Sequence, residues 1–136
     1  MMNKLILKIV SPDGEIFSGE AKSVIVTTVN GELQVLAGHA DLIAPLSTGR
    51  AKLTLTDGTE RSAAVSGGFI LVTKEETKVV ATTFEFADEI DLERANAAKL
   101  KSEEALKAAK EEKDAEVAKA KLMRAISRIS VATGKS

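Results

Sequence analysis

Glycine and proline are unevenly distributed along the 136 residues, and this constrains the fold more than any other feature. Eight of the nine glycines and both prolines lie in the first 68 residues, and after Gly68 neither type recurs until Gly134. Both residue types interrupt helices and favour turns. The first part of the chain is therefore predicted to be rich in turns, whereas the later run of polar residues and alanine is predicted to be helical.

Short runs of β-branched and aliphatic residues alternate with turn signals before that change. Residues 24–29 are the strongest strand signal, and Asn30-Gly31 follows them, a pair that favours a type I′ hairpin with positive φ at both residues. Asp57-Gly58 is a second hairpin signal, and Gly67-Gly68 indicates a strand bulge or tight packing. Eight or more short strands in sequential hairpins predict an antiparallel sandwich or flattened barrel. Aromatic residues make up only 3% of the chain, so we expect a core of Val, Leu, Ile and Ala.

Residues 90–131 are predicted to be helical. In the last part of this run, Leu122, Ile126 and Ile129 form one narrow apolar stripe. In its first part the apolar face is mostly alanine, which favours helix but buries little area. Residues 107–116 are almost all charged or alanine, so a turn is allowed there but not required. The sequence permits both a folded pair of helices and one long helix.

These patterns divide the chain into a β domain, residues 1–87, and a helical domain, residues 88–136. The net charge of −1 gives no reason to expect nucleic acid as a partner. No apolar run approaches the ~20 residues that cross a bilayer, so we expect no direct insertion into the membrane. The absence of cysteine fits a reducing compartment. We therefore expect a soluble intracellular protein.

Residues for catalysis or metal binding are scarce. His39 is the only histidine and there is no cysteine, so a multi-histidine or thiolate metal site is excluded. No Ser-His-Asp set stands at a recognisable spacing. We interpret His39 on its own as a loop residue that makes a local hydrogen bond, and we expect a protein without catalytic residues that is not an enzyme.

Two charged segments in the helical run have more than one interpretation. Asp91 and Arg94 lie three residues apart, within reach of each other on one helical turn, and residues 90–95 fit an ordinary capped surface helix. Arg124 and Arg128 share one helix face. They fit either a solvated basic helix end or a clamp for an anion, because guanidinium binds phosphate and carboxylate in a bidentate way.

A series of segments along the chain resembles a known family. In order, they are Asn30-Gly31-Glu32-Leu33, Gly38-His39-Ala40, Ser66-Gly67-Gly68-Phe69, the hexapeptide IDLERA at residues 90–95, and LMRAISRISVA at residues 122–132. Their order and spacing resemble the epsilon subunit of bacterial F-type ATP synthases over essentially the whole chain. The resemblance implies an N-terminal β-sandwich of about ten strands and a C-terminal two-helix hairpin. It also implies a non-catalytic rotor subunit, peripheral on the cytoplasmic face of the cell membrane.

The resemblance further implies the partners. In that family the sandwich joins the gamma subunit to the membrane c-ring, and the helices extend into the alpha/beta catalytic head and inhibit ATP hydrolysis. The loop at Asn30, Gly31 and Glu32 corresponds to the one that faces the c-ring, and His39 corresponds to a histidine in the loop after the second hairpin. Gln34 and Ala37 depart from the family, which usually has glycine and proline there, and this indicates a slightly altered loop.

The I-D-x-x-R-A segment resembles the ATP-binding motif of the regulatory type of epsilon subunit. The resemblance thus implies no required cofactor but ATP as a regulatory ligand. The implied ligand residues are Glu85, Ile90, Asp91, Arg94, Ala95, Arg124 and Arg128. Lys101 stands where the ATP-binding members have arginine, which implies weaker binding because an ammonium group cannot reproduce the bidentate fork. The rival hypothesis is a free-standing nucleotide-sensing module that works apart from any synthase.

Overall fold

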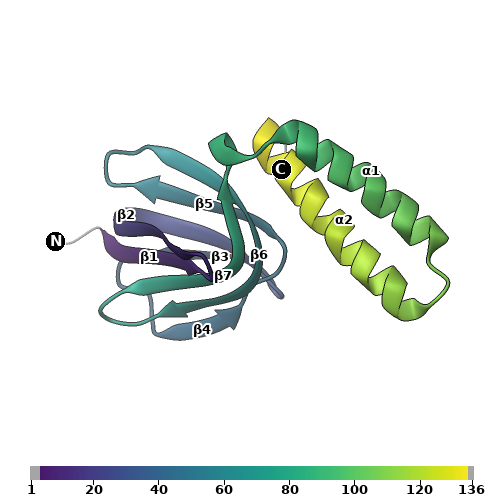
Figure 1. Ribbon diagram of the computed structural model, residues 1–136. Helices are drawn as coiled ribbons and strands as arrows, with labels where there is room; N and C mark the ends of the chain where they lie inside the picture. Colours follow the sequence, from purple (N-terminus) through teal and green to yellow (C-terminus); the bar gives the residue numbers. More distant parts are fainter. Residues whose placement is uncertain (1–3, 135–136) are drawn as a thin grey trace.

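The computed structural model describes residues 4–134, which form seven strands followed by two helices (Figure 1). The elements are β1 (Leu5–Ser11), β2 (Gly14–Thr28), β3 (Gly31–Leu36), β4 (Leu42–Pro45), β5 (Gly49–Leu55), β6 (Glu60–Val72), β7 (Thr77–Phe86), the 3-10 turn η1 (Ala87–Glu89), α1 (Leu92–Ala108) and α2 (Glu112–Thr133). Residues 1–3 and 135–136, the outer ends of the two predicted domains, lie outside the described residues.

The strands close into a flattened barrel. They pair in the cycle β1-β7-β6-β5-β2-β1, with β3 added beside β2 and β4 beside β6. All of these pairs are antiparallel except β1 with β7, which is parallel. The predicted β-sandwich followed by a two-helix hairpin is thus confirmed, and the parallel pair is a feature that the hairpin pattern did not predict.

The expected count of about ten strands is wrong, because two long strands each take the place of two short ones. β2 runs for 15 residues and joins Ile16-Phe17 to residues 24–28, whereas Val29 falls in the turn that follows. Its first half pairs with β1, and its second half pairs with β3 and β5. β6 likewise runs for 13 residues, straight through Gly67-Gly68. A bent strand of this kind serves both layers of the sandwich without a break in the chain.

The Gly67-Gly68 pair is a site of close backbone packing, not a bulge. Both glycines have positive φ, 70° and 97°, yet the register with β7 continues unbroken from Ser66 opposite Thr83 to Gly68 opposite Ala81. A Cβ atom on Gly68 would lie 1.8 Å from the carbonyl oxygen of Val80. Only glycine fits here, so the tight-packing interpretation is the correct one.

The turn between β2 and β3 differs from the predicted type I′. Gly31 has a φ of 111°, but no non-glycine residue among residues 4–134 has positive φ, Asn30 included. The turn residues are Val29 and Asn30, and Gly31 opens β3 opposite Thr28. The Thr28 hydroxyl donates to the Gly31 carbonyl (2.8 Å) and accepts the N–H of Asn30 (3.1 Å). The Thr28 side chain thus supplies hydrogen bonds at this turn, and Gly31, just after it, is the residue with positive φ.

The apolar core is complete within the barrel. Its largest fully buried side chains are Leu7, Ile9, Val24, Val26, Val35, Leu53, Ile70 and Val79. Every member of the core cluster lies between Leu5 and Phe86. The expected composition of Val, Leu, Ile and Ala is confirmed, with Phe86 as the one aromatic member. Neither helix contributes a residue to this core.

The helices form a folded hairpin whose turn, residues 109–111, points away from the barrel (Figure 1). Ala95 and Ser102 are buried on α1, and Ala118 and Ala125 are buried on α2. In each pair the two residues are seven apart, which places them on one helix face. Because these side chains are small, the two helices pack closely while burying little apolar area. Of the two arrangements that the sequence permits, the structure adopts the folded pair.

The stripe of Leu122, Ile126 and Ile129 is not the buried face of α2. Ile126 is 47% exposed, and the other two are only half-buried. α2 packs against α1 on one side and against β6 and β5 on another, so its faces are divided between two neighbours. The buried residues of α2 are Ala118, Ala125 and Val131. They carry a weaker apolar signal in the sequence than the stripe does.

Removing the helical domain tests whether the barrel is independent. We expect a chain ending at Ala87 to fold into a strand-rich domain, since the whole apolar core lies before that point. This domain should unfold in one cooperative transition. Circular dichroism with thermal melting of the truncated and full-length chains makes the measurement. An unfolded truncated chain would contradict the division into two domains.

Candidate functional site

A cavity of about 170 Å³ lies where the end of β7, the start of α1 and the later part of α2 meet. Its lining residues are Glu85, Ile90, Asp91, Arg94, Ala95, Ala98 and Arg128. Six of the seven residues implied as ATP ligands therefore line one cavity. Residues from a strand, a connector and two helices come together here only because the hairpin is folded.

The seventh residue, Arg124, lines a second cavity of about 390 Å³ between α1 and α2. The other residues of that lining are Ala98, Lys101, Ser102, Ala105, Asp114, Val117, Ala118, Lys121, Ala125 and Arg128. Ala98 and Arg128 belong to both linings, so the two cavities are neighbours. The larger one falls within the range of ~300–1,000 Å³ that is typical of small-molecule sites.

Asp91 is the N-cap of α1. Its Oδ1 accepts the backbone N–H of Arg94 (3.1 Å), which satisfies one of the free donors at the helix start. The interpretation of residues 90–95 as an ordinary capped helix is therefore right about the cap. The cap does not engage the Arg94 guanidinium, which has no ion-pair partner within residues 4–134.

One ion pair joins α2 to the barrel at the site. Arg128 Nε lies 3.1 Å from Glu85 Oε1, and the two side chains are 39% and 36% exposed. Glu85 Oε1 is buried but makes no well-aligned hydrogen bond within the described chain. The contact thus balances charge without a strong directional bond. A pair this exposed contributes at most about 1 kcal/mol, so it holds α2 only lightly.

The charges that line the two cavities are mainly positive. The cations are Arg94, Lys101, Lys121, Arg124 and Arg128, and the acids are Glu85, Asp91 and Asp114. Alanines from both helices supply most of the apolar wall. Guanidinium and ammonium groups bind phosphate oxygens, and a smooth apolar wall accepts a flat ring. The arrangement suits a ligand that combines several negative charges with an apolar ring.

Sequence reasoning placed Lys121 one turn before Arg124 and Arg128, but it counted neither Lys121 nor Ala98 among the ligand residues. Ala98 lies four residues after Arg94, and Lys121 lies three before Arg124, so each shares a helix face with a predicted residue. Continuing the helical spacing in both directions from the two arginines would have found them. Asp114, on the first turn of α2, shows no such signal, because it enters the lining only through the fold of the hairpin.

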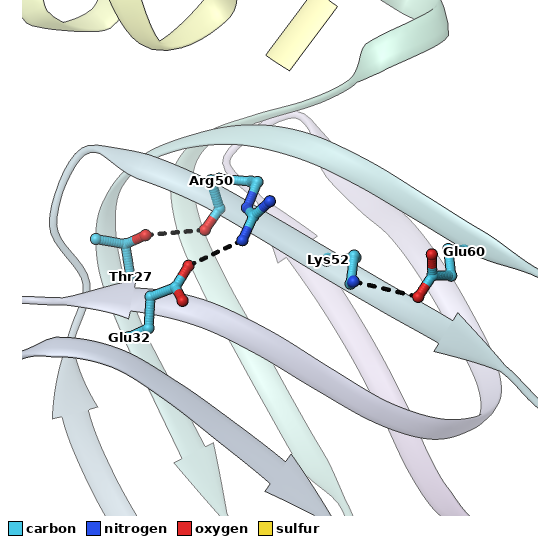
Figure 2. A network of polar contacts seen from close by, with 5 residues as sticks. All are labelled: Thr27, Glu32, Arg50, Lys52 and Glu60. Atoms are coloured by element: carbon cyan, nitrogen blue, oxygen red, sulfur yellow. Dashed lines mark hydrogen bonds and ion pairs between the residues drawn. The ribbon is translucent and has the colours of Figure 1, made fainter. Parts of the chain in front are cut away.

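The residues predicted to contact partners fall into two separate places. Asn30, Gly31 and Glu32 lie at the start of β3, where Glu32 Oε2 accepts a hydrogen bond from Arg50 Nη2 (3.1 Å). Figure 2 shows this pair beside the hydrogen bond from the Thr27 hydroxyl to the carbonyl oxygen of Arg50 (2.9 Å). Glu32 is thus held by Arg50 of β5, across the intervening strand β2, and its side chain remains 55% exposed.

His39 lies beyond the other end of β3. Six strand residues separate it from the Asn30 turn, a distance of about 20 Å at 3.3 Å per residue. Its ring Nδ1 is 2.6 Å from the carbonyl oxygen of Ala40, so the expected local hydrogen bond is confirmed. The structure therefore does not bring His39 together with the Asn30 turn, and one small partner surface does not include both.

Among residues 4–134, no cluster of three or more histidine, cysteine or acidic side chains is arranged to hold a metal ion. In the same part of the chain, neither helix is long and apolar enough to cross a membrane.

Known families and relatives match the chain along almost its full length. A family model described as ATP synthase, Delta/Epsilon chain, beta-sandwich domain matches residues 4–87, and one described as ATP synthase, Delta/Epsilon chain, long alpha-helix domain matches residues 88–133. The ATP synthase epsilon chain of Shouchella clausii is 40% identical over 95% of both chains. That of Staphylococcus aureus is 39% identical over 96% of this chain and 98% of its own.

Solved structures share the fold at lower identity. A chain of the Euglena gracilis mitochondrial ATP synthase, in a structure of OSCP, F1 and the c-ring, has a TM-score of 0.80 at 22% identity. The match covers 90% of this chain and 78% of that one. A chain of the Tetrahymena thermophila mitochondrial ATP synthase, in a structure of the central stalk and c-ring, has a TM-score of 0.59 at 12% identity, over 96% of both chains.

Enlarging a buried alanine of α1 tests the folded hairpin. Ala95 is 2% exposed, so Ala95→Leu is expected to force the helices apart and to cost about 1–3 kcal/mol of hairpin stability. Ala97→Leu, on the exposed face of the same helix, is the matched control and should have little effect. Thermal loss of helical circular dichroism measures both variants. Equal melting of the two would mean that the helices do not pack through Ala95.

Proposed function

The chain belongs to the ATP synthase delta/epsilon chain family, and from that premise we propose that it is a non-catalytic rotor subunit of an F-type ATP synthase. In this proposal the barrel joins a gamma subunit to the c-ring, and the helical hairpin regulates ATP hydrolysis by the alpha/beta catalytic head. The subunit lies at the cytoplasmic face of the cell membrane as a peripheral component. Structures of an F1/c-ring assembly and of a central stalk with its c-ring contain chains of this fold, which supports that placement.

ATP is the proposed regulatory ligand. The observation that supports ATP as the ligand is the smaller cavity, where β7, α1 and α2 meet. Six of the seven residues implied as ligands line it. The remaining residue, Arg124, lines the adjoining cavity together with Lys101 and Lys121. The triphosphate is the anion for these cations, and the alanine wall accepts the base. Lys101 makes the affinity lower than an arginine would, because ammonium acts as a point charge.

The ligand regulates by holding the hairpin closed. Arg94 on α1 and Arg124 and Arg128 on α2 face a common region, and like charges favour separation of the helices when no anion is present. A bound polyphosphate adds charge-assisted hydrogen bonds of about 1.5–3 kcal/mol each to the closed form. The seam between the helices is built of small residues and offers little competing stability. A ligand of modest affinity therefore shifts the balance, and the open form is the inhibitory one.

Titration with ATP tests the regulatory site. We expect ATP to release heat and to compact the isolated protein, and Arg94→Ala or Arg124→Ala to weaken binding roughly ten- to a hundredfold. Lys113→Ala removes one positive charge from α2 outside both cavities and should bind like the wild type. Calorimetry measures the affinity, and small-angle scattering measures the radius of gyration.

One outcome of the same titration would contradict the regulatory site. If millimolar ATP gives the wild type neither heat nor compaction, the chain has no ATP switch, and the coupling role still stands. Co-purification addresses that role and the rival nucleotide sensor, since a rotor subunit should bind a gamma subunit tightly whereas a free-standing sensor should remain alone.

Substitutions at two similar turns test whether the Asn30 turn is the surface that contacts the c-ring. Gly31 and Gly14 each open a strand after a two-residue turn, with φ of 111° and 121° and open space around the missing Cβ. Valine at either position should cost a similar ~1–3 kcal/mol of backbone strain. Only Gly31→Val is expected to reduce co-sedimentation of the subunit and gamma with membranes that hold the c-ring. Equal attachment of both variants would remove the Asn30 turn from the coupling surface.

A further inference from the structure

The connector between the barrel and α1 is short and is held from one side. The chain leaves the barrel at Phe86, makes the single turn η1, and enters α1 at Leu92. Glu89 Oε1 accepts the N–H of Phe86 (3.3 Å), and the N–H of Ile90 donates to the carbonyl of Ala87 (3.3 Å). These local bonds shape the turn, but they do not fix it to the body of the barrel.

Arg61, near the start of β6, makes that attachment. Its guanidinium carbon lies 3.6 Å from the centre of the Phe86 ring, and its Nη2 lies 3.7 Å from Asp88 Oδ1. Phe86 is 4% exposed and packs edge-on against Phe84, with ring centres 5.2 Å apart, so the ring beneath the guanidinium is rigidly held. A cation over an aromatic face is attracted by the ring quadrupole. One side chain thus bridges the last residue of β7 and the connector.

The two contacts of Arg61 are unequal. Asp88 is 76% exposed, so its ion pair is screened by solvent and adds little. The Phe86 ring is buried, and the Arg61 side chain is only 35% exposed, so the stacking contact is the stronger of the two. The held end of the connector is therefore the end nearest the barrel.

Three of the proposed ligand residues flank this connector. Glu85 precedes Phe86, and Ile90 and Asp91 follow η1, so together they form the barrel side of the smaller cavity. Arg94 and Arg128 face them from the helices. Glu85 is held opposite Ala64 in the β6–β7 ladder, so a small shift of the connector would move Ile90 and Asp91 relative to Glu85 and to the two arginines. Arg61 itself lines neither cavity of the site.

We propose that Arg61 is a positioning residue of the nucleotide site, which sets the placement of Ile90 and Asp91 relative to Glu85 by holding the η1 turn against Phe86. The proposal rests on the proposed function for its ligand. Its structural part, that Arg61 holds the connector, stands on contacts that are independent of ATP.

Three variants separate this role from a general effect on the barrel. Arg61→Ala removes the clamp, and Arg61→Lys keeps a cation over the ring. Arg50→Ala is the matched control, because Arg50 is a barrel arginine of similar exposure (32%) that also makes one ion pair, to Glu32, away from the connector. Hydrogen–deuterium exchange is measured on the ATP-free proteins, followed by ATP titration.

In Arg61→Ala we expect faster exchange of the Phe86 and Ile90 amides, unchanged protection of the β1 and β2 amides, and ATP affinity lowered roughly two- to fivefold. Arg61→Lys should recover part of both effects, and Arg50→Ala should match the wild type in both. Partial rescue by lysine would not follow from a purely space-filling role.

Wild-type exchange and wild-type affinity in Arg61→Ala would overturn the proposal. Faster exchange with unchanged affinity would also overturn it, because the connector would then be held without serving the ligand. Absence of ATP binding in the wild type would instead remove the proposed function and the ligand part of this inference. The exchange result would still decide whether Arg61 holds the connector.

Discussion

Closure of the apolar core within residues 5–86 is the constraint from which the remaining structure follows. Once the barrel is complete, the helices have no large apolar surface to share with it. They attach through one half-exposed ion pair at Glu85 and Arg128 and through the packing of α2 on β6 and β5. Each of these attachments contributes little on its own. The position of the hairpin is therefore determined by a small free-energy difference, within reach of a ligand or a partner subunit.

The sequence predicted those parts of the fold that local patterns control. The glycine and proline distribution located the change from strands to helices, and the composition predicted an aliphatic core. What it did not predict depends on distant pairing. Whether Ile16-Phe17 and residues 24–29 form one strand or two is decided by β1, β3 and β5, which bind opposite ends of β2. The parallel contact of β1 with β7 has no local signal at all.

The candidate site, too, is partly predictable from local spacing and partly dependent on contacts between distant segments. Asp91 as a cap and the shared face of Arg124 and Arg128 follow from spacing along one helix. The meeting of Glu85 with Arg128 requires the folded hairpin, and spacing alone cannot supply it. Only the resemblance to a family placed these residues in one set before their positions were known. Asp114 joins the set only through the folded hairpin, because the sequence permitted one long helix equally well.

The unpredicted parallel pair also determines how the barrel resists mechanical load. β7 is the strand that leads to the helices, and it is hydrogen-bonded to β6 along its length and to β1 over residues 77–80. A force applied at Phe86 along the strand acts across both ladders in shear, so many hydrogen bonds must yield together rather than one after another. Among residues 4–134, the connector beyond it is held by the Arg61 clamp, by its own turn bonds and by the packing of η1 beside β6 and α2. Under such a force the light contacts of α2 with β6 and β5 and this joint would therefore yield before the barrel does.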